Sequence, residues 1–578
     1  MAWLSCGARL DGIEHDWTRR HGARTGLLGV VVLAMATGSA LLSAREPSGP
    51  NQSVAQVREI DRQVAEVWKA YSLRPSSPAP DGEWCRRVYL DILGRIPTVD
   101  ELERFLASRG RDKRRKLVRR LLYDEEYTEE YARNWTTLWT NILIGRSGGL
   151  ERRTLISRPG MQKYLRDSFA RNKPYDRMVY ELVTATGTTA PGSPKFNGAV
   201  NFLIEKVNMD KAAQATASVA RLFLGMQVQC TQCHNHPFNS WKQRKFWEFN
   251  AFLRQTRALR QFEAGTRNIA YAELVDQDFA GEGSSPEEAE IYYELRNGLL
   301  KAAYPVFLDG TEIRKSGLLR DVNRREELGK LILGSPYMSR AMVNRMWAHF
   351  MGYGFTKPID DMGPHNSPTH PELLDFLSEE FKRNSYDIKR LIEWIVLSRP
   401  YSLSSATNST NEKVDNPLLG ETPKFSRFYM RQMRAEELYE SLVVATAAQQ
   451  TRGNYAEQER VKAQWLRQFI IAFGNDEGTE MTTFNGTIPQ VLMMFNGDLI
   501  RRATSMKGGS MLAQVIQSKQ KSTKKIEHLY LAALARKPTR NELTMANQLL
   551  RVYKGDAAKA LQDIWWVLLN SNEFIFNH

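Results

Sequence analysis

Cysteine is scarce in this sequence of 578 residues, which contains only four. Cys6 precedes the first long apolar stretch, and Cys85, Cys230 and Cys233 follow it. An odd number of thiols after that stretch excludes a scaffold built on disulfides. We expect Cys85 to be a small buried apolar residue, which leaves the closely spaced pair as the cysteines that carry chemistry.

The sequence also lacks the motifs of several large functional classes. We find no phosphate-binding P-loop, dinucleotide fingerprint or nucleophile motif. A nucleic-acid motif is absent too, although the formal net charge is +15. Because the basic residues are spread along the chain, we expect a solvated, arginine-rich surface and no nucleic-acid partner. We interpret the basic run at 109–120 as a solvated helix face, with anionic lipid or acidic glycans as the alternative partners.

One long uncharged stretch lies near the N-terminus, at residues 25–44. It is long enough to span a bilayer. Arginines precede it, so residues 1–24 are expected to form a cytoplasmic tail. The stretch is either a signal anchor or a signal peptide cut near residues 38–40. We therefore expect an exported protein, anchored in the cytoplasmic membrane facing the periplasm or secreted to the periplasm or cell envelope.

The remaining sequence is dominated by helical patterns. Residues 45–55 form a polar linker, after which apolar residues recur at helical spacing. We predict a mainly α fold: two packed multi-helical modules with a few short strands and an N-terminal hydrophobic helix. The predicted boundaries are a module with the cysteine pair at 56–262, an acidic connecting segment at 263–300 and a companion helical module at 301–578.

One helical corner occurs twice in the sequence. Residues 89–98 end one helix, and Thr98 with Glu101 forms a predicted capping box for the next. Residues 530–539 repeat this pattern near the C-terminus. We interpret both corners as packing units that arose by duplication or convergence.

The strongest functional motif is Cys-Thr-Gln-Cys-His at 230–234. Two cysteines three apart, followed by histidine, are typical of c-type haem attachment. In that hypothesis Cys230 and Cys233 bind the porphyrin and His234 binds iron. His236 completes an alternative zinc set with the same three residues, although such tight spacing strains a tetrahedral site and a distant ligand could replace one histidine. A disulfide or redox pair is the third interpretation.

A second polar cluster occupies residues 360–372. Its carboxylates and imidazoles could bind a metal or perform acid–base chemistry, so Asp361, His365 and His370 are candidate catalytic residues of a hydrolase. The structural alternative is a capping box that begins at Thr369. Candidates for a distal haem ligand are Met226 and His236 nearby in the sequence, and His365 or His370 from the companion module.

Two groups of motifs carry a family resemblance. The first group lies at 89–98, 230–238 and Trp241, and the second at 306–310, 344–350, 369–377, 398–401 and 568–574. They resemble the two modules of an exported family abundant in planctomycetes, domains of unknown function fifteen-forty-nine (cytochrome-type) and fifteen-fifty-three. The resemblance covers nearly everything after residue 55. It implies a mostly helical envelope protein with at most one haem of this type.

The resemblance also implies partners, because relatives are often encoded beside an exported sulfatase-like protein. We therefore expect an envelope protein that binds one c-type haem for electron transfer or small-molecule redox chemistry. Its expected partners are an envelope redox protein or a sulfatase-like protein, with membrane contact through the N-terminal helix. The alternative is a non-catalytic envelope scaffold or glycan-related binding protein with a zinc- or disulfide-stapled loop.

Overall fold

The computed structural model describes residues 55–151, 153–237, 241–283, 285–447, 457–464, 498–506, 510–554 and 556–578. Helices dominate these residues, which confirms the predicted mainly α class. Within these ranges no helix is both long and apolar enough to cross a membrane. The hydrophobic helix predicted at 25–44 lies outside the described residues.

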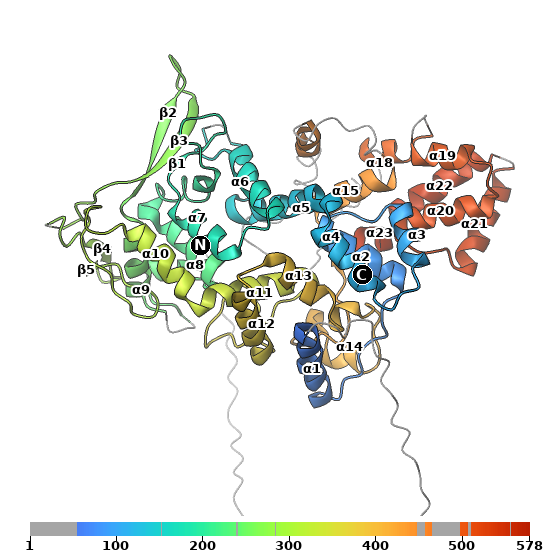
Figure 1. Ribbon diagram of the computed structural model, residues 1–578, viewed down its shortest axis with the longest axis horizontal. Coiled ribbons are helices and arrows are strands. Elements are labelled where there is room, and N and C mark those ends of the chain that lie inside the picture. The colour runs from blue at the N-terminus through green and yellow to red at the C-terminus, as the bar shows by residue number, and fades with distance from the viewer. Residues whose placement is uncertain are drawn as a thin grey trace, which may run out of the picture. The chain divides into compact units, whose positions relative to one another are not determined.

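The first half of the described chain is mainly a succession of helices, which precede and follow the cysteine motif in the sequence (Figure 1). These are α1 (Ala55–Ala70), α2 (Asp81–Leu93), α3 (Val99–Ala107), α4 (Lys113–Tyr123), α5 (Glu125–Ile144), α6 (Arg158–Ala170), α7 (Tyr175–Thr184), α8 (Ala213–Leu224) and α9 (Gln243–Asn250), with the 3-10 helices η1 (Gly198–Phe202), η2 (Asp210–Ala212), η3 (Gln229–Gln232) and η4 (Ala251–Leu253).

The second half of the described chain is again mainly helical from Arg324 onward. Its helices are α10 (Arg324–Gly334), α11 (Pro336–Met351), α12 (Pro371–Arg383), α13 (Ile388–Val396), α14 (Asn411–Val414), α15 (Ala435–Ala445), α18 (Asp498–Ala503), α19 (Met511–Gln517), α20 (Ser522–Leu534), α21 (Arg540–Val552), α22 (Ala557–Leu569) and α23 (Asn572–Ile575), with η5 (Pro400–Ser402) and η6 (Pro417–Leu419).

The strands are few and antiparallel. A three-stranded sheet has the order β1-β3-β2, with β1 (Gly187–Thr188), β2 (Thr256–Phe262) and β3 (Ile269–Asp276). Thr256 pairs with Asp276 at one end of the β2–β3 hairpin, which projects from the helices in Figure 1. Two smaller sheets pair β4 (Ile291–Glu294) with β5 (Leu300–Ala303), and β6 (Arg431–Gln432) with β7 (Phe576–Asn577).

Two hydrophobic clusters form the core. The larger one runs through α1–α13 and includes Trp135 of α5, whose ring lies 5.2 Å from His349 and 6.2 Å from Phe350, both on α11. The smaller one is built from α15 and α18–α23, and it also takes Leu90 and Ile96 from the first helical corner. Each large apolar side chain buried in this way stabilises the fold by about 1.5–3 kcal/mol. Sequence-distant helices therefore share one core.

The two predicted corners have the same local structure. α2 ends at Gly94 and α20 ends at Ala535, and both residues have left-handed backbone angles, with φ of 73° and 54°. Both capping boxes, at Thr98 and Thr539, are formed. The box at Thr98 confirms the sequence prediction. The box at Thr539 shows that the repeated corner has the same cap.

An arginine reinforces each corner, and the start of α2 touches the second corner. Arg95 and Arg536 each pair with the capping glutamate of their own corner at 2.8 Å. A Cβ atom added to Gly82 of α2 would lie 2.1 Å from the carbonyl oxygen of Ala535. Only a glycine permits this close approach of α2 to the second corner. The repeat is thus a packing device that joins the start of the described chain to its end.

Candidate functional site

The short turn η3 follows α8 and holds the cysteine pair, with Cys230 inside the turn and Cys233 as its C-cap. Side chains three residues apart lie on the same side of a 3-10 turn, which places Cys230 and Cys233 together. Thr231 between them is fully buried, and its hydroxyl donates to the carbonyl oxygen of Val228 at 2.6 Å. Both thiols are free and exposed to solvent. Thr231 therefore points into the protein, and the two cysteine side chains are exposed to solvent.

Helix α9 fixes this turn from the other side. The indole of Trp247 donates to the carbonyl oxygen of Gln232 at 3.0 Å, and the amide of Gln243 donates to the same oxygen at 3.2 Å. Gln243 also donates to the carbonyl oxygen of Glu294 in β4, at 2.8 Å. Trp247 stacks on Tyr293 with ring centres 6.1 Å apart. The cysteine turn is thus held by aromatic and amide side chains that are themselves buried.

The two histidines of the motif are half-buried. Nδ1 of His234 lies 2.6 Å from the carbonyl oxygen of Asn235, so an Nδ1 proton donated there leaves Nε2 as the atom with a lone pair. The side chain of Asn235 in turn accepts from the backbone N–H of Gln243 at 3.0 Å. The backbone N–H of His236 donates to the carbonyl oxygen of Trp241 at 2.9 Å. With Nδ1 as the donor, His234 presents Nε2 as its free nitrogen.

Helix α11 positions the second polar cluster. The amide of Asn344 donates to the carbonyl oxygen of Ile359 at 2.8 Å and accepts from the backbone N–H of Phe355 at 2.6 Å. The guanidinium of Arg345 donates to the carbonyl oxygen of Leu222 in α8 at 2.9 Å. These contacts pin the loop after α11 and dock α11 on the helix that precedes the cysteine turn.

The two polar clusters meet in the structure. The backbone N–H of Met362 donates to the carbonyl oxygen of Gly225, the left-handed residue that ends α8, at 2.6 Å. The side chain of Gln227 donates to the buried carboxylate of Asp360 at 2.7 Å, and Arg221 lies 3.9 Å from the same group. The loop at 360–365 and the segment leading into the cysteine turn are therefore tied by both backbone and side chains.

His365 and His236 come together at this junction. Their ring centres are 6.3 Å apart, with an angle of 38° between the ring planes. Nε2 of His365 lies 3.0 Å from a carboxylate oxygen of Asp361. Within the ranges that the structure describes, no three or more His, Cys, Asp or Glu side chains are grouped to hold a metal ion. The structure thus pairs two candidate residues from different clusters and supports one of them with a carboxylate.

His370 lies apart from this pair. It is 3% exposed, and its ring centre lies 5.2 Å from Phe425 and 6.0 Å from Phe355. Burial lowers its pKa to about 4, with a smaller opposing effect from Asp415. The capping box predicted at Thr369 is wrong, because α12 begins at Pro371 with His370 as its N-cap and no side-chain cap. His370 is a neutral core residue at neutral pH.

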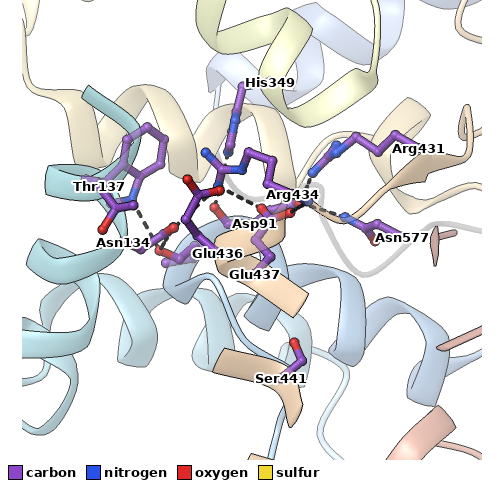
Figure 2. A network of polar contacts seen from close by, with 12 residues as sticks. Asp91, Asn134, Thr137, His349, Arg431, Arg434, Glu436, Glu437, Ser441 and Asn577 are labelled. Carbon is purple, nitrogen blue, oxygen red and sulfur yellow. Dashed lines mark hydrogen bonds and ion pairs between the residues drawn. The ribbon is translucent and has the colours of Figure 1, made fainter. Parts of the chain in front are cut away.

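A further polar centre, which sequence analysis missed, surrounds Asp91 (Figure 2). This carboxylate is fully buried in α2 and accepts hydrogen bonds from Tyr401 at 2.6 Å, from Asn577 at 2.7 Å and from Arg431. Burial raises its pKa to about 6, and the charge of Arg431 opposes that rise. Nε2 of His349 lies 3.4 Å from the Asp91 carbonyl oxygen. In the sequence, the signal for this buried centre was a charged residue, Asp91, within an apolar part of a helix.

The neighbouring arginines bind the end of the chain. Arg86 donates to the carbonyl oxygens of Phe574 and Phe576 at 2.6 and 3.0 Å, and Arg87 donates to that of His578 at 3.0 Å. Both side chains are fully buried. This centre is therefore a structural clamp between α2 and the C-terminus.

Comparison with known proteins finds two families whose models match this chain. Residues 59–258 match the family PSCyt2, described as a protein of unknown function (DUF1549), and residues 324–550 match the family PSD1, described as a protein of unknown function (DUF1553). The chain therefore contains one domain of each family, which confirms the family resemblance of its motifs. His236 lies in the first domain, and His365 lies in the second. No curated protein and no solved structure matches the chain.

Proposed function

We propose that this protein carries one covalently attached c-type haem and takes part in electron transfer or small-molecule redox chemistry in the cell envelope. The observation that supports the proposal is the pair of free, exposed thiols on one side of η3, followed directly by His234. Two thiols so placed can bond to two vinyl groups at one porphyrin edge, and the imidazole that follows can bind the iron. The donor set therefore fits the group.

The surrounding residues have defined tasks in this proposal. The carbonyl oxygen of Asn235 accepts the Nδ1 proton of His234 and directs Nε2 towards iron. Trp247 and Gln243 keep the turn rigid. Lys242 and Lys245 are exposed at the start of α9 and offer cations for the carboxylates of a porphyrin. A bound haem would supply a reversible one-electron couple at this surface.

The proposed compartment follows from the N-terminal sequence. The uncharged stretch at 25–44 supports export, and attachment through Cys-x-x-Cys-His takes place outside the cytoplasmic membrane. The proposed partners are an envelope redox protein or an exported sulfatase-like protein.

Absorption spectroscopy tests the haem proposal. The full chain is produced in a host with working cytochrome c maturation, beside Cys230→Ala and a matched Cys85→Ala variant, whose thiol is buried in the core. We expect a Soret band that remains with the protein after denaturation, is lost from Cys230→Ala and persists in Cys85→Ala. A colourless wild-type protein that contains zinc would overturn the proposal.

A second candidate function is a non-catalytic glycan-related binding protein with a stapled loop. A cavity of about 400 Å³ favours it, and its lining includes the polar side chains of Asn134, Thr137, Glu436 and Gln458. Carboxylate and amide groups in a cavity are suited to bind hydroxyl groups. Binding of acidic or neutral oligosaccharides, lost in Asn134→Leu but retained in Cys230→Ala, would favour this function over the first.

A further inference from the structure

We propose that a cavity between the start of α6 and the β2–β3 hairpin binds a small hydroxylated molecule through an oxyanion group, which is a carboxylate, sulfate or phosphate. The cavity has a volume of about 390 Å³, within the usual range for small-molecule sites. Residues at 153–159, 189–190 and 267–271 line it. Among its described residues the lining has three arginines and one glutamate, so the cavity is positively charged at neutral pH.

Two arginines of this cavity have no carboxylate partner in the part of the chain that the structure describes. They are Arg153 and Arg267, and both are exposed. The turn that carries Arg267 is ordered, because the side chain of Asn268 donates to the carboxylate of Glu263 at 3.2 Å and its backbone N–H donates to the hydroxyl of Thr266 at 3.1 Å. A guanidinium presents a fixed fork of donors that matches the oxygens of an oxyanion. These two side chains are therefore available to an anionic ligand.

A buried amide ties two walls of the cavity together. The side-chain oxygen of Asn201 accepts from the backbone N–H of Ser157 at 2.7 Å, and its nitrogen donates to the carbonyl oxygen of Thr189 at 3.1 Å. Ser157 is the N-cap of α6, and Thr189 follows β1. Asn201 itself is fully buried. Because the walls are fixed before a ligand arrives, binding costs less conformational freedom.

Two hydroxyl groups of the lining suit a hydroxylated ligand. Oγ of Ser157 accepts from the backbone N–H of Gly160 at 3.2 Å, and within the described ranges no acceptor takes its proton. The hydroxyl of Tyr271 also lines the cavity and has no partner among the described residues. Each of these hydroxyls can donate one hydrogen bond. The cavity therefore combines cations for an oxyanion with polar groups for the rest of the ligand.

The backbone of Arg153 supports its assignment as a ligand-binding residue. Its φ is 103°, in a region that favours glycine and is costly for a residue with a side chain. Such positions are concentrated at binding and active sites, where the task of the side chain outweighs the strain. Arg153 is therefore placed at the cavity at a cost in stability, as expected of a functional residue.

Isothermal titration calorimetry of the full chain tests the site. The probes are glucose 6-phosphate, glucose 6-sulfate and glucuronate, with glucose as the neutral control. We expect at least one of the three anions to bind with one-to-one stoichiometry, more weakly at higher salt, whereas glucose should not bind. The anion that binds most tightly identifies the oxyanion group. If none of the three anions binds, or if glucose binds as tightly as they do, the proposal is overturned.

Two arginine variants separate ligand loss from misfolding. Arg267→Gln should weaken binding of the preferred anion at least tenfold, the effect of losing a charged hydrogen bond. Arg296→Gln is the matched control, because it removes an exposed arginine from the turn between β4 and β5, and it should bind as wild type does. Arg153→Gly should weaken binding as strongly while its melting temperature stays the same or rises, because glycine relieves the strained φ.

Unchanged affinity in both Arg267→Gln and Arg153→Gly would overturn the site. A lower melting temperature for Arg153→Gly would show that this arginine is structural and would overturn its assignment. Cys230→Ala and Asn134→Leu should bind the anion as wild type does, because neither residue lines this cavity. Loss of anion binding in either of these two variants would contradict a separate site, whatever the outcome of the haem and oligosaccharide experiments.

Discussion

Replacing His370 with phenylalanine should make the protein less sensitive to acid. The imidazole lies between the rings of Phe355 and Phe425, and its Nδ1 lies 2.9 Å from the hydroxyl of Thr369. Its Nε2 is buried without a hydrogen-bond partner among the described residues. A phenylalanine fills similar space and removes this unsatisfied atom, so the variant should be at least as stable as wild type near pH 7.5.

The magnitude follows from proton linkage. The folded-state pKa of His370 is about 4, against about 6.5 for an unfolded histidine. The unfolded chain therefore binds a proton more readily, so the neutral imidazole's contribution is complete above about pH 6.5 and is lost as the pH falls towards 4. Between about pH 7.5 and 4.5 this one group should remove about 2.5 kcal/mol from the free energy of unfolding.

Urea unfolding followed by tryptophan fluorescence at several pH values provides the assay. The difference in unfolding free energy between His370→Phe and wild type should grow by about 2.5 kcal/mol from pH 7.5 to 4.5. Other buried histidines are present in both proteins, so their contributions cancel. Ser367→Ala, an exposed substitution in the segment before His370, is the control, and its pH profile should follow wild type. Parallel profiles for His370→Phe and wild type would refute the assignment of His370 as a buried neutral residue.

Three other substitutions test the packing. Asp91→Ala leaves the charge of Arg431 without its buried partner and should cost about 3–5 kcal/mol in urea unfolding; a loss below about 1 kcal/mol would show that the clamp contributes little. Gly82→Ala forces a methyl group to within 2.1 Å of the Ala535 carbonyl oxygen and should cost about 1–3 kcal/mol, measured as a lower melting temperature; an unchanged melting temperature would contradict the contact between α2 and the second corner. Thr98→Ala removes an N-cap and should cost about 1 kcal/mol, whereas Thr98→Ser should restore it.

Local features were the most predictable from sequence. The first corner needs only residues close in the chain, so the capping box of Thr98 and Glu101 was predicted correctly. The burial of Cys85 was also predicted correctly. By contrast, the capping box at Thr369 was wrong, since the histidine after it occupies the N-cap position. Phe355 and Phe425, which pack against His370, are distant from it in sequence. No local pattern therefore predicts that His370 is buried.

Contacts between distant segments could not be predicted. The approach of His236 to His365 depends on α11 docking against α8 through Arg345, and no local pattern encodes that docking. The long hairpin at 256–276 was missed as well, because much of β2 is solvent-exposed and lacks a strong apolar alternation. The candidate residues were therefore visible in the sequence, but their grouping was not.

Mass spectrometry of the intact denatured protein tests the central claim most directly. The chain is purified from a host with cytochrome c maturation and measured beside a variant with both Cys230→Ala and Cys233→Ala. We predict that wild type is heavier than its polypeptide by one haem and that the variant has the mass of the polypeptide alone. A wild-type mass without the added haem, from a host that matures a control cytochrome c, would contradict the account.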